Sequence, residues 1–263
     1  MAKWFSYYLI KIEFLGFRYH GWQKQAKLKS VQGMIDKTFA FILGHTDFKT
    51  LGCGRTDAKV SADDFAFELF VNEFFDCDEL LIRLNKELPS DIRAKSVQEV
   101  STDFNIIQHS KIKEYHYYFS SGTKSHPFNA PLIRDFGASL NIELMKEAAA
   151  LFIGTHNFKR FASKPSANTI FERSISLSVI EENIRFVDVY TPKEAYVFKV
   201  RSKGFLRYQV RLMVGALVDV GRGTMTLEDL KETLADFNGT QIRHIAPSSG
   251  LILHKVEFDL DFD

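Results

Sequence analysis

The sequence predicts an α+β protein with an antiparallel or mixed sheet. Segments of alternating apolar side chains mostly occur in pairs between segments with helical spacing, whereas a doubly wound parallel sheet alternates single strands with helices. The 263 residues are enough for one large domain or two small ones. With 45% hydrophobic and 25% charged residues, the composition is that of a globular chain and argues against long disorder.

The first hundred residues read as strand, helix, strand, helix, strand. In "YYLIKIEF" the side chains of Tyr8, Ile10 and Phe14 share one face, as in a half-buried strand. Ser30 is suited to cap the helix that follows, and Pro89 lies just beyond the expected end of the next helix. The expected elements are a strand over 7–14, a helix over 30–44, a strand over 65–71, a helix over 77–88 and a strand over 91–100.

The remaining residues repeat this mixture of elements. Thr226 and Asp229 have the spacing of a capping box at the start of a helix. The expected strands lie over 113–121, 174–182, 184–191, 195–203 and 250–258, and the expected helices over 141–154, 205–221 and 226–236. The polar stretch 101–111 is the expected seam between two halves. Because it separates two complete sets of elements, we expect subdomains over 1–106 and 107–263.

Composition and motifs exclude several kinds of function. The net charge is +1, which neither indicates nor excludes a nucleic-acid partner, because binding depends on where basic side chains cluster. The two cysteines, Cys53 and Cys77, have no metal-type spacing and suit a reducing cytoplasm. The first residues do not read as a signal peptide, and no apolar run has the length of a membrane span. The sequence has no phosphate-binding glycine motif and no paired metal-ligand spacing, so we expect no nucleotide cofactor, no other cofactor and no metal.

One short stretch, "LGCGRTDAKVSADDF", raises the question of function. Asp57 lies in a loop after two glycines and just before an alternating apolar run. An aspartate in such a loop is ordinary turn chemistry, since its side chain can bond to the backbone nearby. The alternative is that the carboxylate acts on a substrate.

Several stretches, taken in order, favour the second interpretation. "GRTDAKVSA" closely resembles the catalytic motif of the TruA-type tRNA pseudouridine synthases. "FLGFRYHGWQKQ" and "SVQGMIDKTF" resemble that family's N-terminal segment and following helix, and "KEYHYYF" resembles its tyrosine-bearing strand. "GFLRYQVRLMVGALVDVGRG" and "APSSGLILHKVEF" resemble its arginine-bearing helix and final strand. The resemblance therefore spans nearly the whole chain.

The resemblance implies a fold and a reaction. The fold has two subdomains of RRM-like or ferredoxin-like character, whose largely antiparallel sheets join across a central catalytic cleft. The reaction is an isomerisation, uridine to pseudouridine in the anticodon stem-loop of tRNA at positions 38 to 40, and it needs no cofactor or metal. The family also implies a cytoplasmic homodimer with tRNA as its partner.

Three residues match the family's catalytic positions. Asp57 is the essential carboxylate, and such a group can attack as a nucleophile or stabilise positive charge on a sugar. Arg211 is the cation implied to keep that carboxylate ionised, because burial alone would raise its pKa. Tyr115 is implied to stack on the flipped uracil and is a candidate proton acceptor.

Further residues are expected to contact RNA. Helical spacing places Arg207 and Arg211 on one face, four residues apart, beside an apolar stripe. Lys59 stands where the family has a glycine, which suggests an altered loop or an added phosphate contact. For Trp22 and Gln23 a role in stabilising the fold remains an alternative. The complete set of expected RNA contacts is Arg55, Lys59, Arg207, Arg222, Trp22 and Gln23.

Two other functions remain open. One is an RNA-binding protein on the same fold without catalysis. The other is a carboxylate hydrolase such as a glycosidase, which needs paired carboxylates. Asp63 or Asp64 would then have to act with Asp57.

Overall fold

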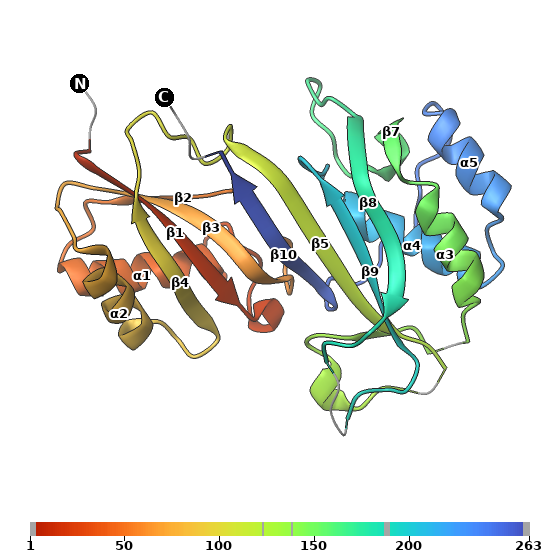
Figure 1. The fold of residues 1–263 in the computed structure, drawn as a ribbon, viewed down its shortest axis with the longest axis horizontal. Helices are drawn as coiled ribbons and strands as arrows, with labels where there is room; N and C mark the ends of the chain where they lie inside the picture. Colours follow the sequence, from red (N-terminus) through yellow and green to blue (C-terminus); the bar gives the residue numbers. More distant parts are fainter. Residues whose placement is uncertain (1–3, 123, 138, 187–189, 260–263) are drawn as a thin grey trace. The chain divides into compact units, whose positions relative to one another are not determined.

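The computed structural model describes residues 4–122, 124–137, 139–186 and 190–259. Within it the chain forms two compact units (Figure 1). Unit 1 consists of residues 1–111 together with 253–263, and unit 2 consists of residues 112–252. The C-terminal strand thus belongs with the N-terminal half, because it pairs with a strand of that half.

Unit 1 is built on an antiparallel sheet with the order β4-β1-β3-β10, to which β2 is added beside β3. Its strands are β1 (Ser6–Phe14), β2 (Lys49–Gly52), β3 (Ser61–Val71), β4 (Ile92–Glu99) and β10 (Leu251–Phe258). Strand β1 pairs Tyr8 with Leu69 of β3, so the apolar faces predicted for the two strands point the same way.

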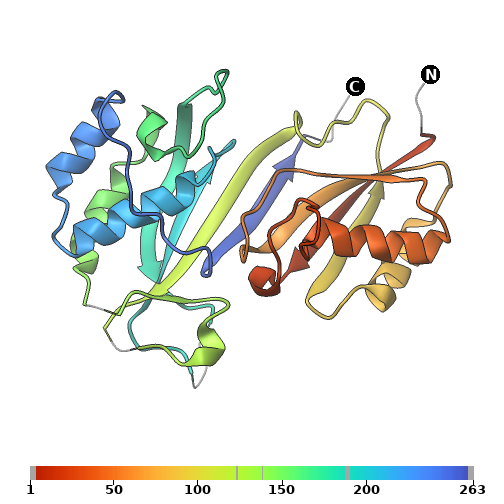
Figure 2. The ribbon, with the colours of Figure 1, turned by 180° about the vertical axis from the view of Figure 1, so that it is seen from behind.

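Two helices cover the apolar face of this sheet, α1 (Val31–Leu43) and α2 (Cys77–Glu87), as seen from behind in Figure 2. The Ser30 hydroxyl accepts a hydrogen bond from the Gly33 N–H and begins α1, as the sequence predicts. Phe39 of α1 is fully buried and packs edge-on against Phe67 of β3. A short 3-10 turn, η1 (Gly16–Arg18), follows β1.

Unit 2 has a mixed sheet, with the order β5-β9-β8-β7 and with β6 parallel to β5. Its strands are β5 (Ser110–Ser120), β6 (Arg134–Asp135), β7 (Gly154–Asn157), β8 (Glu172–Glu182) and β9 (Ala195–Ser202). Its helices are α3 (Ile142–Ala150), α4 (Gln209–Gly221) and α5 (Leu227–Ala235), with 3-10 turns η2 (Pro127–Asn129) and η3 (Lys159–Phe161).

The α4 helix lies deeper in the protein than the other helices of unit 2. Eleven of its thirteen residues are buried. Gly215 makes this possible, because a Cβ there would lie 1.8 Å from the carbonyl oxygen of His244. A helix so tightly enclosed holds any polar side chain at its margin in a defined position.

The predicted α+β class is confirmed, and several element boundaries are wrong. The helix predicted over 205–221 begins only at Gln209, because Tyr208 has φ 64° and cannot be helical. The helix predicted over 141–154 ends at Ala150, and residues from Gly154 form the unpredicted strand β7. Strands β2 and β6 were also not predicted.

The strand predicted over 184–191 is not found in the part of that stretch that the structure describes, residues 184–186 and 190–191. The Asn183 side chain accepts hydrogen bonds from the N–H groups of Arg185 and Phe186 and turns the chain. Phe186 then packs against Tyr118, at 4.7 Å between ring centroids. An apolar side chain of the predicted strand thus packs, partly buried, against the core although its backbone forms a turn. Residues 187–189 lie outside the described residues.

None of the helices within the described residues has both the length and the apolar character needed to cross a membrane.

Candidate active site

Asp57 lies in the loop of unit 1 that joins β2 to β3. The two strands are antiparallel, and the pairing continues one residue beyond them, where the Cys53 N–H donates to the Ala66 carbonyl. The loop then closes through a hydrogen bond from the Val60 N–H to the Asp57 carbonyl, 3.2 Å. The turn leaves Asp57 half-buried and Arg55 exposed.

The segment after β1 holds this loop from the other side. The Trp22 N–H donates to the Thr56 carbonyl at 3.3 Å, and the Lys59 N–H donates to the Tyr19 carbonyl at 3.0 Å. Gly21 has φ 87°, and a Cβ there would lie 2.2 Å from the Thr56 carbonyl oxygen. The two family-like motifs, near residues 14–25 and 54–62, are therefore one structural element that fixes the backbone of Asp57.

Trp22 does not face outward, and its predicted RNA contact is wrong. Its side chain is 2% exposed and stacks at 4.3 Å on Phe65, below the loop. Gly52 leaves it room, because a Cβ there would lie 2.4 Å from the Trp22 indole nitrogen. The alternative interpretation, that Trp22 stabilises the fold, agrees with this position. Gln23 is half-buried and its amide donates to the Gln32 side chain of α1 at 3.1 Å.

A buried polar anchor, which the sequence did not predict, supports the same segment. The Tyr19 hydroxyl donates to Asp91 at 2.7 Å, and the Arg18 guanidinium donates to the other carboxylate oxygen at 2.8 and 2.6 Å. Burial raises the pKa of Tyr19, and the Asp91 carboxylate raises it further. Burial opposes ionisation of Asp91, but these hydrogen bonds hold its pKa below the ordinary value. The phenol therefore stays protonated and the carboxylate charged.

Lys59 keeps the backbone conformation that a glycine would favour. Its φ is 69°, in the left-handed region that glycine adopts without strain. Its side chain is exposed, with the ammonium 5.5 Å from the centre of the Phe17 ring. This backbone conformation favours the added RNA contact over an altered loop, and that contact stays a prediction.

The other two predicted catalytic residues lie in unit 2. Tyr115 and Tyr117 point to the same face of β5, because they are two residues apart. Tyr115 is half-buried and packs edge-on against Phe205, 5.3 Å between centroids. The Tyr117 hydroxyl donates to the Pro247 carbonyl at 2.8 Å. Burial raises the pKa of Tyr117, opposed by the charges of Arg134 and Arg211.

Arg211 is held on the first turns of α4. Its Nε donates to the Ala246 carbonyl at 2.7 Å, and the Ala246 N–H donates back to the Arg211 carbonyl at 3.1 Å. Its guanidinium also lies 4.8 Å from the centre of the Tyr208 ring. A half-buried guanidinium fixed in this way is a positioned positive charge.

Arg207 does not share the helical face predicted for it. It precedes α4 in the turn formed by Tyr208, and its guanidinium lies 5.1 Å from the centre of the Tyr208 ring. The two arginines therefore do not lie on successive turns of one helix. Instead, both guanidinium groups lie close to the Tyr208 ring. Arg222 follows the other end of α4, eleven residues beyond Arg211, which corresponds to roughly 16 Å along the axis. Its side chain is exposed and donates to the Phe136 carbonyl at 3.3 Å.

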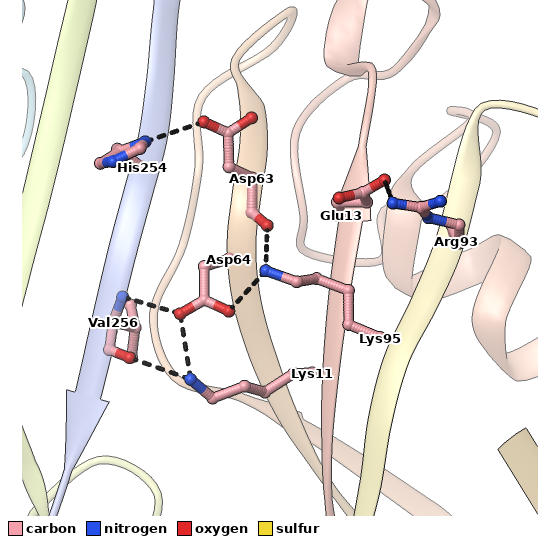
Figure 3. Close-up of polar contacts among 8 residues, drawn as sticks. All are labelled: Lys11, Glu13, Asp63, Asp64, Arg93, Lys95, His254 and Val256. Carbon is pink, nitrogen blue, oxygen red and sulfur yellow. Dashed lines mark hydrogen bonds and ion pairs between the residues drawn. The ribbon is translucent and has the colours of Figure 1, made fainter.

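The carboxylates that a hydrolase would need are bonded to basic side chains (Figure 3). Asp64 accepts from Lys11 at 3.0 Å and from Lys95 at 3.1 Å. Asp63 pairs with His254 at 3.0 Å. A glycosidase needs two carboxyl groups that are both available to the scissile bond, whereas these two already bond to side chains and backbone of unit 1. This pair therefore does not support the hydrolase interpretation.

The opposite face of β5 carries a second buried ion pair that the sequence did not reveal. Glu114 accepts from His116 at 2.7 Å and from the Arg201 guanidinium at 2.8 and 2.6 Å. Burial opposes ionisation, but these partners hold the pKa of Glu114 below its ordinary value. The pair faces away from Tyr115 because side chains alternate along the strand. It fixes β5 against β9 rather than acting at the face that carries Tyr115.

Comparison with known proteins gives a consistent result. The family described as tRNA pseudouridine synthase matches residues 148–259. Across 253 residues the chain is 31% identical to "tRNA pseudouridine synthase A 1" of Protochlamydia amoebophila, covering 96% of each protein. It is 32% identical to "tRNA pseudouridine synthase A" of Clostridium botulinum over 93% of this chain and 96% of the relative. It is 33% identical to "tRNA pseudouridine synthase A 2" of Bacillus thuringiensis over 95% of this chain and 99% of the relative.

Proposed function

Because the chain belongs to the tRNA pseudouridine synthase family, we propose that it isomerises uridine to pseudouridine in the anticodon stem-loop of tRNA, at positions 38 to 40. The relatives that match over nearly their whole length carry the name tRNA pseudouridine synthase A. The observation that carries the proposal is the Asp57 loop, whose backbone is bonded to the segment around Gly21 and thereby presented in one conformation.

The reaction rearranges bonds without any net gain or loss of atoms. The N1–C1′ glycosidic bond breaks, the uracil turns while bound, and C5 bonds to C1′. The hydrogen on C5 leaves as a proton, and N1 takes one up. We assign Asp57 as the carboxylate that either attacks the nucleotide or stabilises positive charge on the sugar.

Arg211 and Tyr115 complete the proposed catalytic set. A guanidinium near the Asp57 carboxylate would keep it ionised when the RNA excludes water. Arg211 suits this role because the Ala246 carbonyl and the Tyr208 ring restrict its side chain. Tyr115 would stack on the turning base and accept the C5 proton. We propose that these three side chains act together on one nucleotide.

RNA binding would depend on a few cations, because the net charge of the chain is only +1. We propose contacts from Arg55 and Lys59 near the Asp57 loop, and from Arg207 and Arg222 around α4. Electrostatic binding of this kind weakens steeply as salt rises. We also propose that the enzyme works in the cytoplasm as a homodimer, which would provide two such sets of cations. A salt-independent affinity for tRNA would contradict the cation assignment.

The decisive experiment compares the wild type with Asp57→Asn on unmodified tRNA transcripts, with pseudouridine and free uracil measured separately. The proposal expects pseudouridine from the wild type, and no detectable product from a folded Asp57→Asn variant that still binds tRNA. Asp63→Asn is the matched control and should retain activity, because Asp63 pairs with His254. Free uracil as the product would establish the hydrolase instead. Binding without turnover by the wild type would establish a non-catalytic RNA-binding protein.

A further inference from the structure

Phe17 is an exception among the aromatic side chains near the Asp57 loop. Phe14, Tyr19 and Trp22 are 5%, 1% and 2% exposed, whereas Phe17 is 36% exposed. It lies in η1, the short turn between β1 and the segment that supports the loop. Its ring therefore contributes less to the core than its neighbours do, and it presents an aromatic surface to solvent.

Lys59 is the second exception, because it occupies a conformation that side chains rarely adopt. Its φ of 69° is the left-handed region, where glycine is free of strain. The strain is not compensated by an ion pair, since Lys59 forms none in the part of the chain that the structure describes. A strained residue beside a catalytic loop points to a role for its side chain.

The Phe17 and Lys59 side chains lie close together, and the backbone segments that carry them are bonded to each other. The Lys59 ammonium lies 5.5 Å from the centre of the Phe17 ring. The Lys59 N–H is bonded to the Tyr19 carbonyl at 3.0 Å, two residues beyond Phe17. Gly16 also packs directly on the backbone of the loop, since a Cβ there would lie 1.8 Å from the Val60 carbonyl oxygen. The backbone segments that carry the ring and the ammonium therefore hold a fixed relation to Asp57, which precedes Lys59 by two residues.

The Lys59 ammonium is able to bind an anion, unlike the nearby guanidinium of Arg18. Arg18, next to Phe17 in sequence, is already bonded to Asp91 through two nitrogens. Arg55, on the other side of Asp57, is exposed. A partly exposed aromatic ring with an ammonium over it matches one nucleotide, because the ring can stack on a base when the cation turns to bind a phosphate.

We propose that Phe17 and Lys59 form a subsite for an unstacked nucleotide next to the target uridine on the same RNA strand. Turning a uridine out of its stack also frees the faces of its neighbours. A neighbouring base would lie on Phe17 and its phosphate on Lys59, while Asp57 acts on the target. This inference rests on the proposed function and adds to it a contact that selects the conformation of the RNA beside the reacting nucleotide.

The test measures tRNA affinity and steady-state kinetics of pseudouridine formation for Phe17→Ala, Phe17→Trp and Lys59→Gly. Loss of base stacking on one ring corresponds to about a 5- to 150-fold weaker Kd. Phe17→Ala should therefore raise Kd and KM by that factor and leave kcat within about twofold. This is the result expected when the ground state and the transition state lose the same binding free energy. Phe17→Trp should restore affinity, because indole also stacks.

Lys59→Gly separates charge from backbone effects. Glycine accepts the φ of this position, so the loop should keep its shape. We expect the slope of log Kd against log salt to fall by about 0.7 to 1, which is the loss of one phosphate contact. Phe41→Ala and Lys164→Gly are matched controls. Phe41 is 71% exposed in unit 1, and Lys164 is an exposed lysine with φ 48° in unit 2. Both controls should leave Kd and the salt slope unchanged.

Three outcomes would overturn the subsite. They are an unchanged Kd in Phe17→Ala, an unchanged salt slope in Lys59→Gly, or a fall in kcat at constant KM, which indicates a structural effect on Asp57. These results are distinct from a failure of the proposed function, in which the wild type itself forms no pseudouridine. The results for the variants are interpreted only if the wild type forms pseudouridine.

Discussion

Glu68 makes the stability of unit 1 depend on pH near neutrality. It lies on β3 with 1% of its surface exposed. One carboxyl oxygen accepts from the Ile106 N–H at 3.4 Å, and within the described residues the other has no hydrogen-bond partner. Burial raises the pKa of Glu68 to about 7, although the Ile106 N–H and the charge of Lys49 oppose the shift. A buried carboxyl with so little hydrogen bonding is more stable protonated.

The direction of the effect follows from where the proton binds more tightly. Between the ordinary pKa of 4.5 and the folded value of about 7, the folded state holds the Glu68 proton more tightly than the unfolded state. The free energy of unfolding must therefore fall as pH rises through this window and level off above it. At about 1.4 kcal/mol for each pH unit, the loss attributable to Glu68 is about 3 kcal/mol.

Glu68→Gln removes this dependence, because the amide has a similar shape and does not titrate. We expect the difference in unfolding free energy, variant minus wild type, to increase by about 3 kcal/mol between pH 5 and pH 8. Urea unfolding followed by tryptophan fluorescence measures it for unit 1 alone, because the chain has two tryptophans, Trp4 and Trp22, and both belong to that unit. Taking the difference cancels the other titrating groups.

The matched control is Glu99→Gln, since Glu99 is an exposed carboxylate on β4 of the same unit. Its difference from the wild type should stay within about 0.5 kcal/mol across the same pH range, as for most surface substitutions. A Glu68→Gln difference equally flat from pH 5 to pH 8 would refute the reasoning.

Three further substitutions test other parts of the structure. Gly215→Ala should lower the unfolding free energy by about 1–3 kcal/mol or more, because the new Cβ would lie 1.8 Å from the His244 carbonyl oxygen; a Tm measurement detects it. Gly21→Ala should reduce kcat for pseudouridine formation at least tenfold, because it forces a left-handed residue against the backbone that holds Asp57. Asp64→Ala should lower the unfolding free energy of unit 1 by about 1–3 kcal/mol, since two lysines and a backbone N–H lose their acceptor; urea unfolding measures it.

For each of these three predictions, one experimental result would contradict it. Gly204→Ala is the control for the α4 glycine, because nothing lies within 4 Å of a Cβ there; equal Tm values for the two variants would mean that α4 shifts freely. An unchanged kcat in Gly21→Ala would mean that the loop is positioned by other contacts. A stability of Asp64→Ala equal to wild type would mean that the lysines of Figure 3 find water as readily as the carboxylate.

The parts of the fold that the sequence predicted well are those with local causes. The α1 helix begins where Ser30 caps it, and α5 begins at the capping box of Thr226 and Asp229. Strand β1 follows the alternation of its apolar side chains. In each of these, side chains within a few residues determine the local structure, so the pattern along the chain was sufficient.

The parts that were not predicted depend on contacts between distant residues. Tyr208 interrupts the apolar run before α4 without any glycine or proline to signal it, and its ring lies against Arg207 and Arg211. Tyr19 and Asp91 are 72 residues apart, and their hydrogen bond joins the segment after η1 to the residue just before β4. The motif around residues 14–25 matched a segment of the family. It did not predict that Trp22 would be buried against Phe65 while its N–H bonds to the Asp57 loop.

Lys59 shows why a motif can retain its geometry when its residues change. A non-glycine residue in the left-handed region costs about 1–2 kcal/mol. The loop keeps that conformation here because two backbone hydrogen bonds, from Lys59 to Tyr19 and from Val60 to Asp57, hold it on both sides. The glycine of the family pattern therefore relieves strain but does not create the turn. Because the turn forms without a glycine, this position can carry a side chain that contacts the substrate. Such a contact must contribute at least as much free energy as the left-handed conformation of Lys59 costs.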